Sequence, residues 1–260
     1  MKHAHLSFVD DGACHLKNFL DDETKNFVKE IIFENFKNDL KLKQFNSFDI
    51  EDDAFHQKLI NLRAEFPKRF GEIYDNINLN ARFRSIFLND KMLSFFSEAL
   101  GVSKNLLFVN GFMLRLDGPL DKKNSLGWHQ DSPYYMMSYP NFNAGVCWMS
   151  VTKNTSENGT LMYIPKSHSE MISANAIKSD AQSSRQFPIS MSNKELINSK
   201  NLDQEFGDIS LLHLNLKHKS GINTSNKFRI TMGCRVHYIG KTFNSGNEIF
   251  KFHNPKFSLS

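Results

Sequence analysis

The strongest constraint on the fold is a change of hydrophobic pattern about a hundred residues into the chain. Before it, apolar residues recur at helical spacing in Asp21–Phe36, Asp53–Phe70 and Asp90–Leu100. After it, apolar runs are short or alternate with polar residues, and Gly, Asn, Ser and Pro separate them. The sequence therefore predicts a helix-rich region over residues 1–101 and a β core over residues 102–240.

We expect these two regions to form one domain. The chain has 260 residues, 40% of them hydrophobic, which is enough to bury one substantial core. Residues 169–205 are polar and rich in Ser, Asn and Lys, and they are too numerous for an ordinary connection. We expect a lid or a mobile insertion there, within a single domain that spans residues 1–260.

Composition argues against several classes of protein. The formal net charge is only +4, and the cations are scattered, so nothing favours a nucleic-acid partner. Cys14, Cys147 and Cys234 are too few and too far apart to predict disulfides or a structural zinc site. Because no run of residues resembles a signal sequence or a membrane span, we expect a cytoplasmic protein without a membrane partner.

A candidate metal site begins at Gly127–Asp131, where an extended backbone would place His129 and Asp131 on one face. A surface histidine beside a turn-forming aspartate is the competing interpretation, so a third ligand is needed. His213 and His218 follow, and either would complete a set of two imidazoles and one carboxylate. Such a set leaves adjacent coordination positions open, as in non-haem Fe(II) sites that use dioxygen.

Two arginines are candidates for an anionic ligand of such a metal site. Along Phe228–Tyr238 apolar residues alternate with polar ones, which places Arg229 and Thr231 on the same face. A guanidinium can bond both oxygens of a 2-oxo acid's distal carboxylate, although an exposed strand cation is the competing interpretation of Arg229. Arg115 could contact a co-substrate or an anionic substrate, but its position on a predicted strand favours a solvent-facing cation.

Taken in order, these motifs resemble the phytanoyl-CoA dioxygenase family. The resemblance covers about Phe108 to Tyr238, with a weaker similarity in Gly12–Leu20 to the strand that enters the family's first helix. Lys166 departs from the family pattern, which usually has glycine in that turn. The matching segments are His129-x-Asp131, Glu157–Leu161, Ile164–His168 and His218–Ser225, followed by Arg229.

The resemblance implies a role for each matching residue. It implies that His129, Asp131 and His218 ligate iron. It leaves His213 either as a support for the metal ligands or as a packing residue, and His168 as a structural residue. Arg229 follows His218 by the family's spacing and is the implied partner of the co-substrate carboxylate. The further co-substrate residues that the resemblance implies are Ser220, Trp148 and Gln130, although Trp148 and Gln130 could equally be packing residues.

The fold implied by the family is mainly β with helical additions: a cupin-like double-stranded β-helix, or jelly roll, buttressed by the N-terminal helices. The implied enzyme is an Fe(II)- and 2-oxoglutarate-dependent dioxygenase that hydroxylates an unactivated C–H bond of a small-molecule metabolite. It would consume O2 and release succinate and CO2, with ascorbate as a candidate reductant. Because related halogenases replace the metal-binding carboxylate with a small residue, Asp131 argues against halogenation.

Other interpretations of the same sequence are open. A non-catalytic jelly roll that binds a metal or a ligand is the main alternative, and a hydrolytic zinc enzyme is a third. The aromatic and methionine-rich segment Ser132–Pro140 is either an adaptable wall of the substrate pocket or a loop packed on the core. The sequence predicts neither the substrate nor the oligomeric state.

Overall fold

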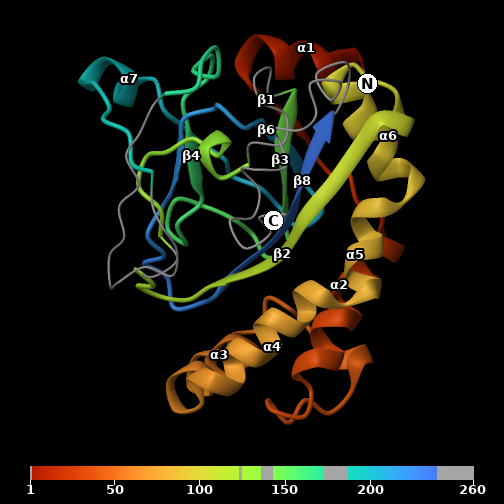
Figure 1. Cartoon of the computed structure of the whole chain (residues 1–260). Helices are drawn as coiled ribbons and strands as arrows, with labels where there is room; N and C mark the ends of the chain where they lie inside the picture. Colours follow the sequence, from red (N-terminus) through yellow and green to blue (C-terminus); the bar gives the residue numbers. More distant parts are fainter. Residues whose placement is uncertain (1, 123–124, 136–142, 173–186, 239–260) are drawn as a thin grey trace, which may run out of the picture.

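The computed structural model describes residues 2–122, 125–135, 143–172 and 187–238. Two antiparallel sheets face each other, and most of the helices lie along one side of them (Figure 1). The larger sheet has the strand order β1-β6-β3-β8-β2, and the smaller has the order β5-β4-β7. The strands are β1 Ala13–Leu16, β2 Leu107–Asp117, β3 Ala144–Ser150, β4 Leu161–Tyr163, β5 Lys200–Asn201, β6 Ile209–His213, β7 His218–Ser220 and β8 Arg229–Tyr238.

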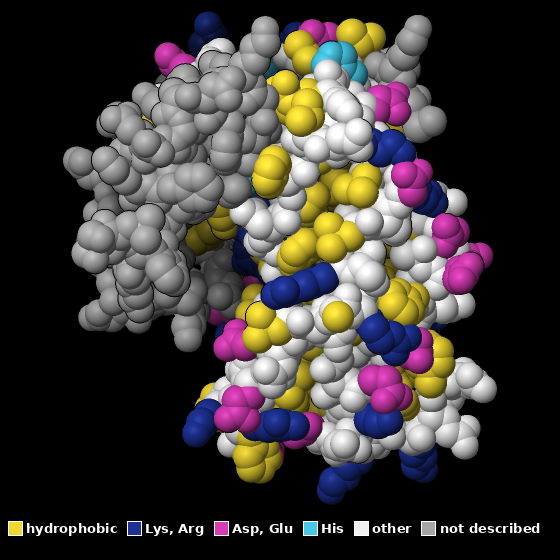
Figure 2. Space-filling view, turned by 45° about the vertical axis from the view of Figure 1, so that its right-hand side comes forward, with side chains coloured by type: hydrophobic (Ala, Val, Ile, Leu, Met, Phe, Trp, Pro, Cys, Tyr) yellow, Lys and Arg dark blue, Asp and Glu magenta, His cyan; other side chains and the backbone are white. Residues whose placement is uncertain are grey.

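Most of the helical region lies between β1 and β2 in the sequence, and it covers the outer face of the large sheet. Its helices are α1 Lys2–Asp11, α2 Asp22–Phe36, α3 Asp53–Glu65, α4 Pro67–Leu79, α5 Ala81–Leu88 and α6 Asp90–Leu100, and a short α7, Asn193–Ile197, follows later. Acidic and basic side chains are interspersed over the surface of this side, with apolar side chains between them (Figure 2). Among the residues described, no helix is both long and apolar enough to cross a membrane.

The helix boundaries follow from local capping. Asp21 begins α2 because its carboxylate accepts a hydrogen bond from the Thr24 N–H, and Asn89 begins α6 in the same way. The helix predicted over Asp53–Phe70 is instead two helices, α3 and α4. Pro67 disfavours helical geometry at Phe66 and is itself suited to the first turn of α4. The helix is therefore interrupted at Phe66, between α3 and α4.

Strand β8 lies between β3 and β2, and its two faces have different surroundings. Ile230, Met232, Cys234 and Val236 pack with the helices in the larger hydrophobic core, which confirms that they share one face. The alternate residues face the space between the two sheets, where β3 and β6 contribute a smaller apolar cluster. The polar face of β8 is therefore an interior wall of the molecule.

The predicted lid falls partly outside the described residues, which exclude 173–186. In its described part, α7 begins with a capping box between Ser192 and Glu195, and β5 pairs with β4. The Ile189 N–H donates to the Trp128 carbonyl at 2.9 Å, so this segment contacts the chain beside His129. The lid itself stays a prediction.

Candidate metal and co-substrate site

Backbone pairing brings His129, Asp131 and His218 together. His129 and His218 form an antiparallel bridge, and their N–H groups donate to each other's carbonyls at 2.9 and 3.0 Å. The Asp131 N–H donates to the Leu214 carbonyl at 2.8 Å, which holds the next turn of chain against the same segment. As a result, one potential ligand atom from each of these three side chains lies within 4.8 Å of the others.

Hydrogen bonds to backbone carbonyls orient both imidazoles. His129 Nδ1 lies 2.7 Å from the Gly127 carbonyl, and His218 Nδ1 lies 2.8 Å from the Leu216 carbonyl. A carbonyl can only accept, so each Nδ1 carries the proton and each Nε2 keeps a free lone pair. These Nε2 atoms lie 3.6 and 3.9 Å from the carboxylate oxygens of Asp131. The lone pairs and the carboxylate converge on one point.

The protonation states suit metal binding. Burial lowers the pKa of His218 to about 4, so its imidazole is neutral at pH 7. Burial alone would raise the pKa of Asp131, but His218 and His129 hold it well below its usual range. Neutral imidazole and ionised carboxylate are the forms that ligate a metal. Two imidazoles and one carboxylate could hold Fe(II) and leave coordination positions free.

The structure also distinguishes His213 from His218, the two candidates for the third ligand. His213 Nδ1 accepts a hydrogen bond from the Asn215 N–H at 3.0 Å, and its ring lies 5.0 Å from that of His168. His168 in turn bonds the Val9 carbonyl. Of the two, His218 is the one that joins His129 and Asp131, and His213 and His168 pack at a different place in the fold.

A cavity adjoins the three side chains and leaves about 450 Å³ free of protein atoms, including the part open to solvent. Two residues predicted to contact the co-substrate, Ser220 and Trp148, belong to its lining. Two arginines, Arg115 and Arg235, lie there as well. Apolar side chains complete the wall: Met113, Leu126, Val146, Leu161 and Leu212.

Arg115 is not the solvent-facing cation that the strand pattern favoured. Its side chain is 15% exposed, and its guanidinium lies 5.5 Å from the centre of the Trp148 ring. The interpretation was wrong because alternation assigns residues to faces without saying whether a face meets solvent. Here the second face of β2 borders the cavity.

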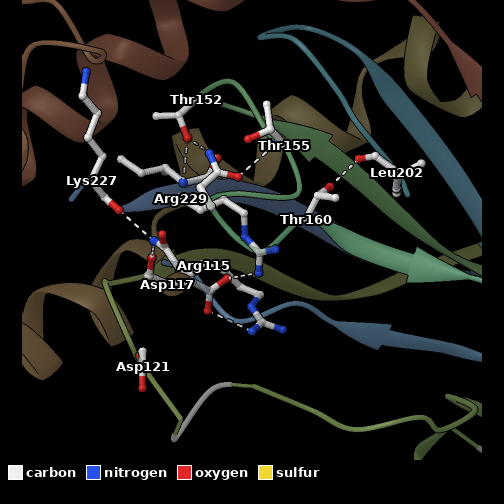
Figure 3. A network of polar contacts seen from close by, with 12 residues as sticks. Arg115, Asp117, Asp121, Thr152, Thr155, Thr160, Leu202, Lys227 and Arg229 are labelled. Carbon is white, nitrogen blue, oxygen red and sulfur yellow. Dashed lines mark hydrogen bonds and ion pairs between the residues drawn. The ribbon is translucent and has the colours of Figure 1, made fainter. Parts of the chain in front are cut away.

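Asp117 joins Arg115 to Arg229, a role that the sequence motifs did not predict. Its two carboxylate oxygens accept hydrogen bonds from Arg115 at 2.9 Å and from Arg229 at 2.6 Å (Figure 3). Burial would raise the pKa of Asp117, but the two guanidinium groups hold it below its usual value. Its position two residues after Arg115 on the same strand was the available signal.

Arg229 is buried, with only 3% of its side chain exposed, and the competing interpretation as an exposed cation is wrong. Asp117 occupies one of its nitrogens, while Nε and Nη1 have no hydrogen-bond partner in the described part of the chain. The Thr231 hydroxyl, on the same strand face, is also buried without a partner. Buried donors without partners are costly, and a bound carboxylate would accept from them. Arg229 does not itself line the cavity, but Arg115, which shares Asp117, does.

Gln130 is placed differently from the other predicted residues. Its amide nitrogen donates to the carbonyls of Glu170 and Asn215, and its oxygen accepts from the Ile172 N–H at 2.7 Å. The side chain thus ties two segments of backbone together and is absent from the cavity lining. These contacts give no support to the predicted role of Gln130 in co-substrate binding.

The segment after the metal motif is partly described. Ser132–Tyr134 forms a turn of 3-10 helix, and the Tyr134 ring packs edge-on against His129 and Phe187. The Tyr135 ring lies 4.4 Å from the Arg235 guanidinium, beside the cavity. Of the predicted pocket wall, residues 136–140 lie outside the described residues.

Comparisons with solved structures support this architecture. The chain resembles the non-heme monooxygenase ThoJ, with a TM-score of 0.59 and 17% identity over 90% of this chain and 77% of that one. It also resembles EctD from S. alaskensis, solved with 2-oxoglutarate and 5-hydroxyectoine, with a TM-score of 0.58 and 15% identity over 91% and 76% of the two chains.

A third similar structure is the epimerase SnoN in complex with Fe3+, alpha ketoglutarate and nogalamycin RO, with a TM-score of 0.58 and 15% identity over 93% of this chain and 88% of that one. These likenesses confirm the jelly-roll fold with helical additions. No curated protein matches the chain by sequence.

The family itself is identified by its sequence model. The model described as phytanoyl-CoA dioxygenase (PhyH) matches residues 8–231, which include α2 to α6, β1 to β7, the three candidate metal ligands and Arg229. The match confirms the resemblance and the predicted class of enzyme, a 2-oxoglutarate-dependent non-haem iron oxygenase. The chain therefore belongs to the phytanoyl-CoA dioxygenase family.

Proposed function

We propose that this protein hydroxylates an unactivated C–H bond of a small-molecule metabolite, with Fe(II) held by His129, Asp131 and His218. The observation that carries the proposal is the convergence of two fixed Nε2 lone pairs on a buried, ionised carboxylate. The donor set fits a six-coordinate ion that keeps positions free for a chelating co-substrate and for O2.

The co-substrate in this proposal is 2-oxoglutarate, with its distal carboxylate bound by Arg229. Support comes from the unpartnered Nε and Nη1 of Arg229 and the unpartnered Thr231 hydroxyl, because a bound carboxylate would accept from donors that have no other described partner. Arg115 and Ser220 reach the cavity beside the metal ligands and would assist there, and Trp148 would form the wall. EctD and SnoN, which share the fold, were solved with this co-substrate.

The proposed reaction converts substrate R–H, O2 and 2-oxoglutarate into R–OH, succinate and CO2. One oxygen atom enters the substrate, and the other enters succinate. Iron with its bound 2-oxo acid supplies the oxidising power. The protein's part is to place the reacting carbon beside the metal and to keep water away, which suits the apolar lining of Met113, Val146 and Leu212.

Anaerobic titration of the metal-free protein with Fe(II) and 2-oxoglutarate tests the site. Wild type should develop the weak visible charge-transfer band of the chelate. His218→Ala should abolish the band by removing a ligand, and Arg229→Ala should demand far more 2-oxoglutarate to reach it. Arg82→Gln is a matched control, because Arg82 lies on the helical surface and pairs with Glu30. No band in folded, iron-containing wild type would favour the non-catalytic binding protein.

Product analysis then tests the type of oxidation. A hydroxylated product gains one oxygen atom, and with 18O2 that atom carries the label. SnoN is described as an epimerase, and epimerisation would leave the product's mass unchanged. Succinate formation with an unlabelled product of unchanged mass would therefore replace hydroxylation with epimerisation while keeping the oxygenase site.

A further inference from the structure

We propose that Arg235 binds an anionic group of the substrate, a carboxylate, phosphate or sulfate, and so restricts the enzyme to acidic small molecules. This inference rests on the proposed function and concerns the same cavity. Arg235 lies on β8 and lines the cavity together with His129, Asp131 and His218. No motif in the sequence assigns it a role.

Arg235 is too far along β8 to share an anion with Arg229. The two residues are six positions apart on one strand face, a separation of about 20 Å at the usual rise of a strand. Arg115 pairs with Thr231, near the Arg229 end of the strand. A five-carbon diacid is much shorter than this separation. Co-substrate held by Arg229 therefore leaves Arg235 free for a second anion.

Three contacts fix the Arg235 side chain beside the cavity. Its Nη1 donates to the Gly111 carbonyl at 2.9 Å and lies 3.5 Å from the Met113 sulfur. Its guanidinium stacks on Tyr135 at 4.4 Å. None of these contacts supplies a negative charge. The group is therefore held in place without being neutralised.

A bulge in β2 makes the room for this arginine. The register between β2 and β8 shifts between Asn110 and Met113, and Gly111 within the shift has a φ of 58°. A Cβ on Gly111 would lie only 2.7 Å from the Arg235 Cδ. Both the positive φ and the close approach favour glycine. The backbone of β2 is thus shaped around the Arg235 side chain.

The charges of the site leave Arg235 uncompensated. Fe(II), Asp131 and 2-oxoglutarate together carry one net negative charge, and the set of Arg115, Asp117 and Arg229 carries one net positive charge. Arg235 has no ion pair with any described residue, and its buried Nε has no hydrogen-bond partner. Asp131 is close enough to feel the charge of Arg235 but belongs to the proposed metal site. A partly buried guanidinium without an ion pair among the described residues favours an anion in the remaining part of the cavity.

Calorimetric titration of the protein, saturated anaerobically with Fe(II) and 2-oxoglutarate, tests the inference. The probes are hexanoate, hexyl phosphate and hexyl sulfate, with hexanamide and hexanol as neutral counterparts, because apolar side chains form part of the lining. At least one anion should bind wild type, and its neutral counterpart should bind about tenfold or more weakly. Arg235→Gln should weaken the anion by about 10- to 100-fold and remove its advantage.

Two further variants separate charge from fold. Arg235→Lys retains the charge and should bind the anion better than Arg235→Gln, while Arg82→Gln should bind like wild type. All variants should keep the wild-type charge-transfer band, which reports on the proposed function independently of the second anion. Failure of every anion to bind wild type, or equal affinity in Arg235→Gln, would overturn the inference. Weakened 2-oxoglutarate binding in Arg235→Gln would overturn it too, by assigning Arg235 to the co-substrate.

Discussion

The two faces of strand β8 contrast sharply although they belong to the same ten residues. One face consists of Ile230, Met232, Cys234 and Val236, which pack against the helices in a dry apolar core. The other includes Arg229, Thr231 and Arg235, with buried nitrogen and oxygen atoms that lack partners. One strand thus carries most of its packing on one side and most of its unsatisfied polarity on the other.

This contrast indicates how a small domain can tolerate costly polar groups. Each buried donor without a partner costs free energy, and the apolar face offsets that cost through burial and close packing. Substitutions on the two faces should therefore affect different properties. Changes on the helix-facing side should lower stability and spare ligand binding, and changes on the cavity side should do the reverse.

The largest effect is expected at the proposed metal ligands. Asp131→Asn keeps the size of the side chain and the backbone bond to Leu214 but removes the anionic ligand. The charge-transfer band of the Fe(II) and 2-oxoglutarate complex should disappear, while the melting temperature of the metal-free protein shifts only slightly. Anaerobic absorption spectra and calorimetry measure both. A large fall in melting temperature would show that Asp131 also supports the fold.

The opposite result is expected at Ile230, which is fully buried on the helix-facing side. Ile230→Ala should lower the free energy of unfolding by about 2–5 kcal/mol, since it removes buried methyl groups and leaves a cavity. Urea denaturation measures the loss, and the folded variant should still form the charge-transfer band. Leu79→Ala is the control, because Leu79 is 66% exposed and should cost far less. Loss of the band in folded Ile230→Ala would break the contrast.

Acid should weaken the helix-facing side through His56. Its Nδ1 accepts a hydrogen bond from the Phe228 N–H, and burial lowers its pKa to about 4. The unfolded state takes up this proton near pH 6.5 and the folded state only near pH 4, so stability should fall as the pH drops through that window. The contribution is at most about 1.4 kcal/mol per pH unit.

The matched variant is His56→Asn, whose amide oxygen can accept the same bond but does not titrate. Thermal unfolding of metal-free protein from pH 7 to pH 4 should show a shallower loss in this variant than in wild type. His15 and His213, whose pKa values burial also lowers to about 4, contribute to both profiles and cancel in the comparison. Identical slopes would contradict the role of His56.

The smallest effect is expected at Thr231, the neighbour of Ile230 on the cavity side. Thr231→Val keeps the shape and removes a hydroxyl that has no partner in the described structure. Stability should stay the same or rise by up to about 1 kcal/mol. The affinity for 2-oxoglutarate should fall by about three- to tenfold, as expected for one lost hydrogen bond to a carboxylate. Titration of the charge-transfer band with 2-oxoglutarate measures this affinity. An unchanged affinity would show that the Thr231 hydroxyl takes no part in binding 2-oxoglutarate.

Much of the fold could be predicted because its signals are local. Helical spacing and capping residues identified α2 and α6, and alternation identified β8. Pro67 is also a local signal for the break between α3 and α4. The prediction of one continuous helix gave more weight to the apolar stripe than to this proline. The bulge at Gly111 depends on how β2 meets β8, and no pattern within one strand specifies the register of another.

The site shows the same division between local and distant information. The proposed metal ligands lie 89 positions apart at their extremes, His129 and His218, and only the family resemblance selected His218 over His213. The burial of Arg115 and the linking role of Asp117 could not be predicted, because alternation does not distinguish a cavity from solvent. That distinction depends on the second sheet, whose position is a matter of tertiary packing.

The backbone bridge between His129 and His218 bears on how the protein would bind and exchange iron, a scarce and easily oxidised metal. Because main-chain hydrogen bonds hold both ligands, their arrangement does not need an ion to create it. The chain would then fold first and bind iron later. A molecule that lost its iron could bind another ion without refolding. Other divalent ions would bind at the same site, so the availability of each metal, more than the protein, would decide which ion is bound.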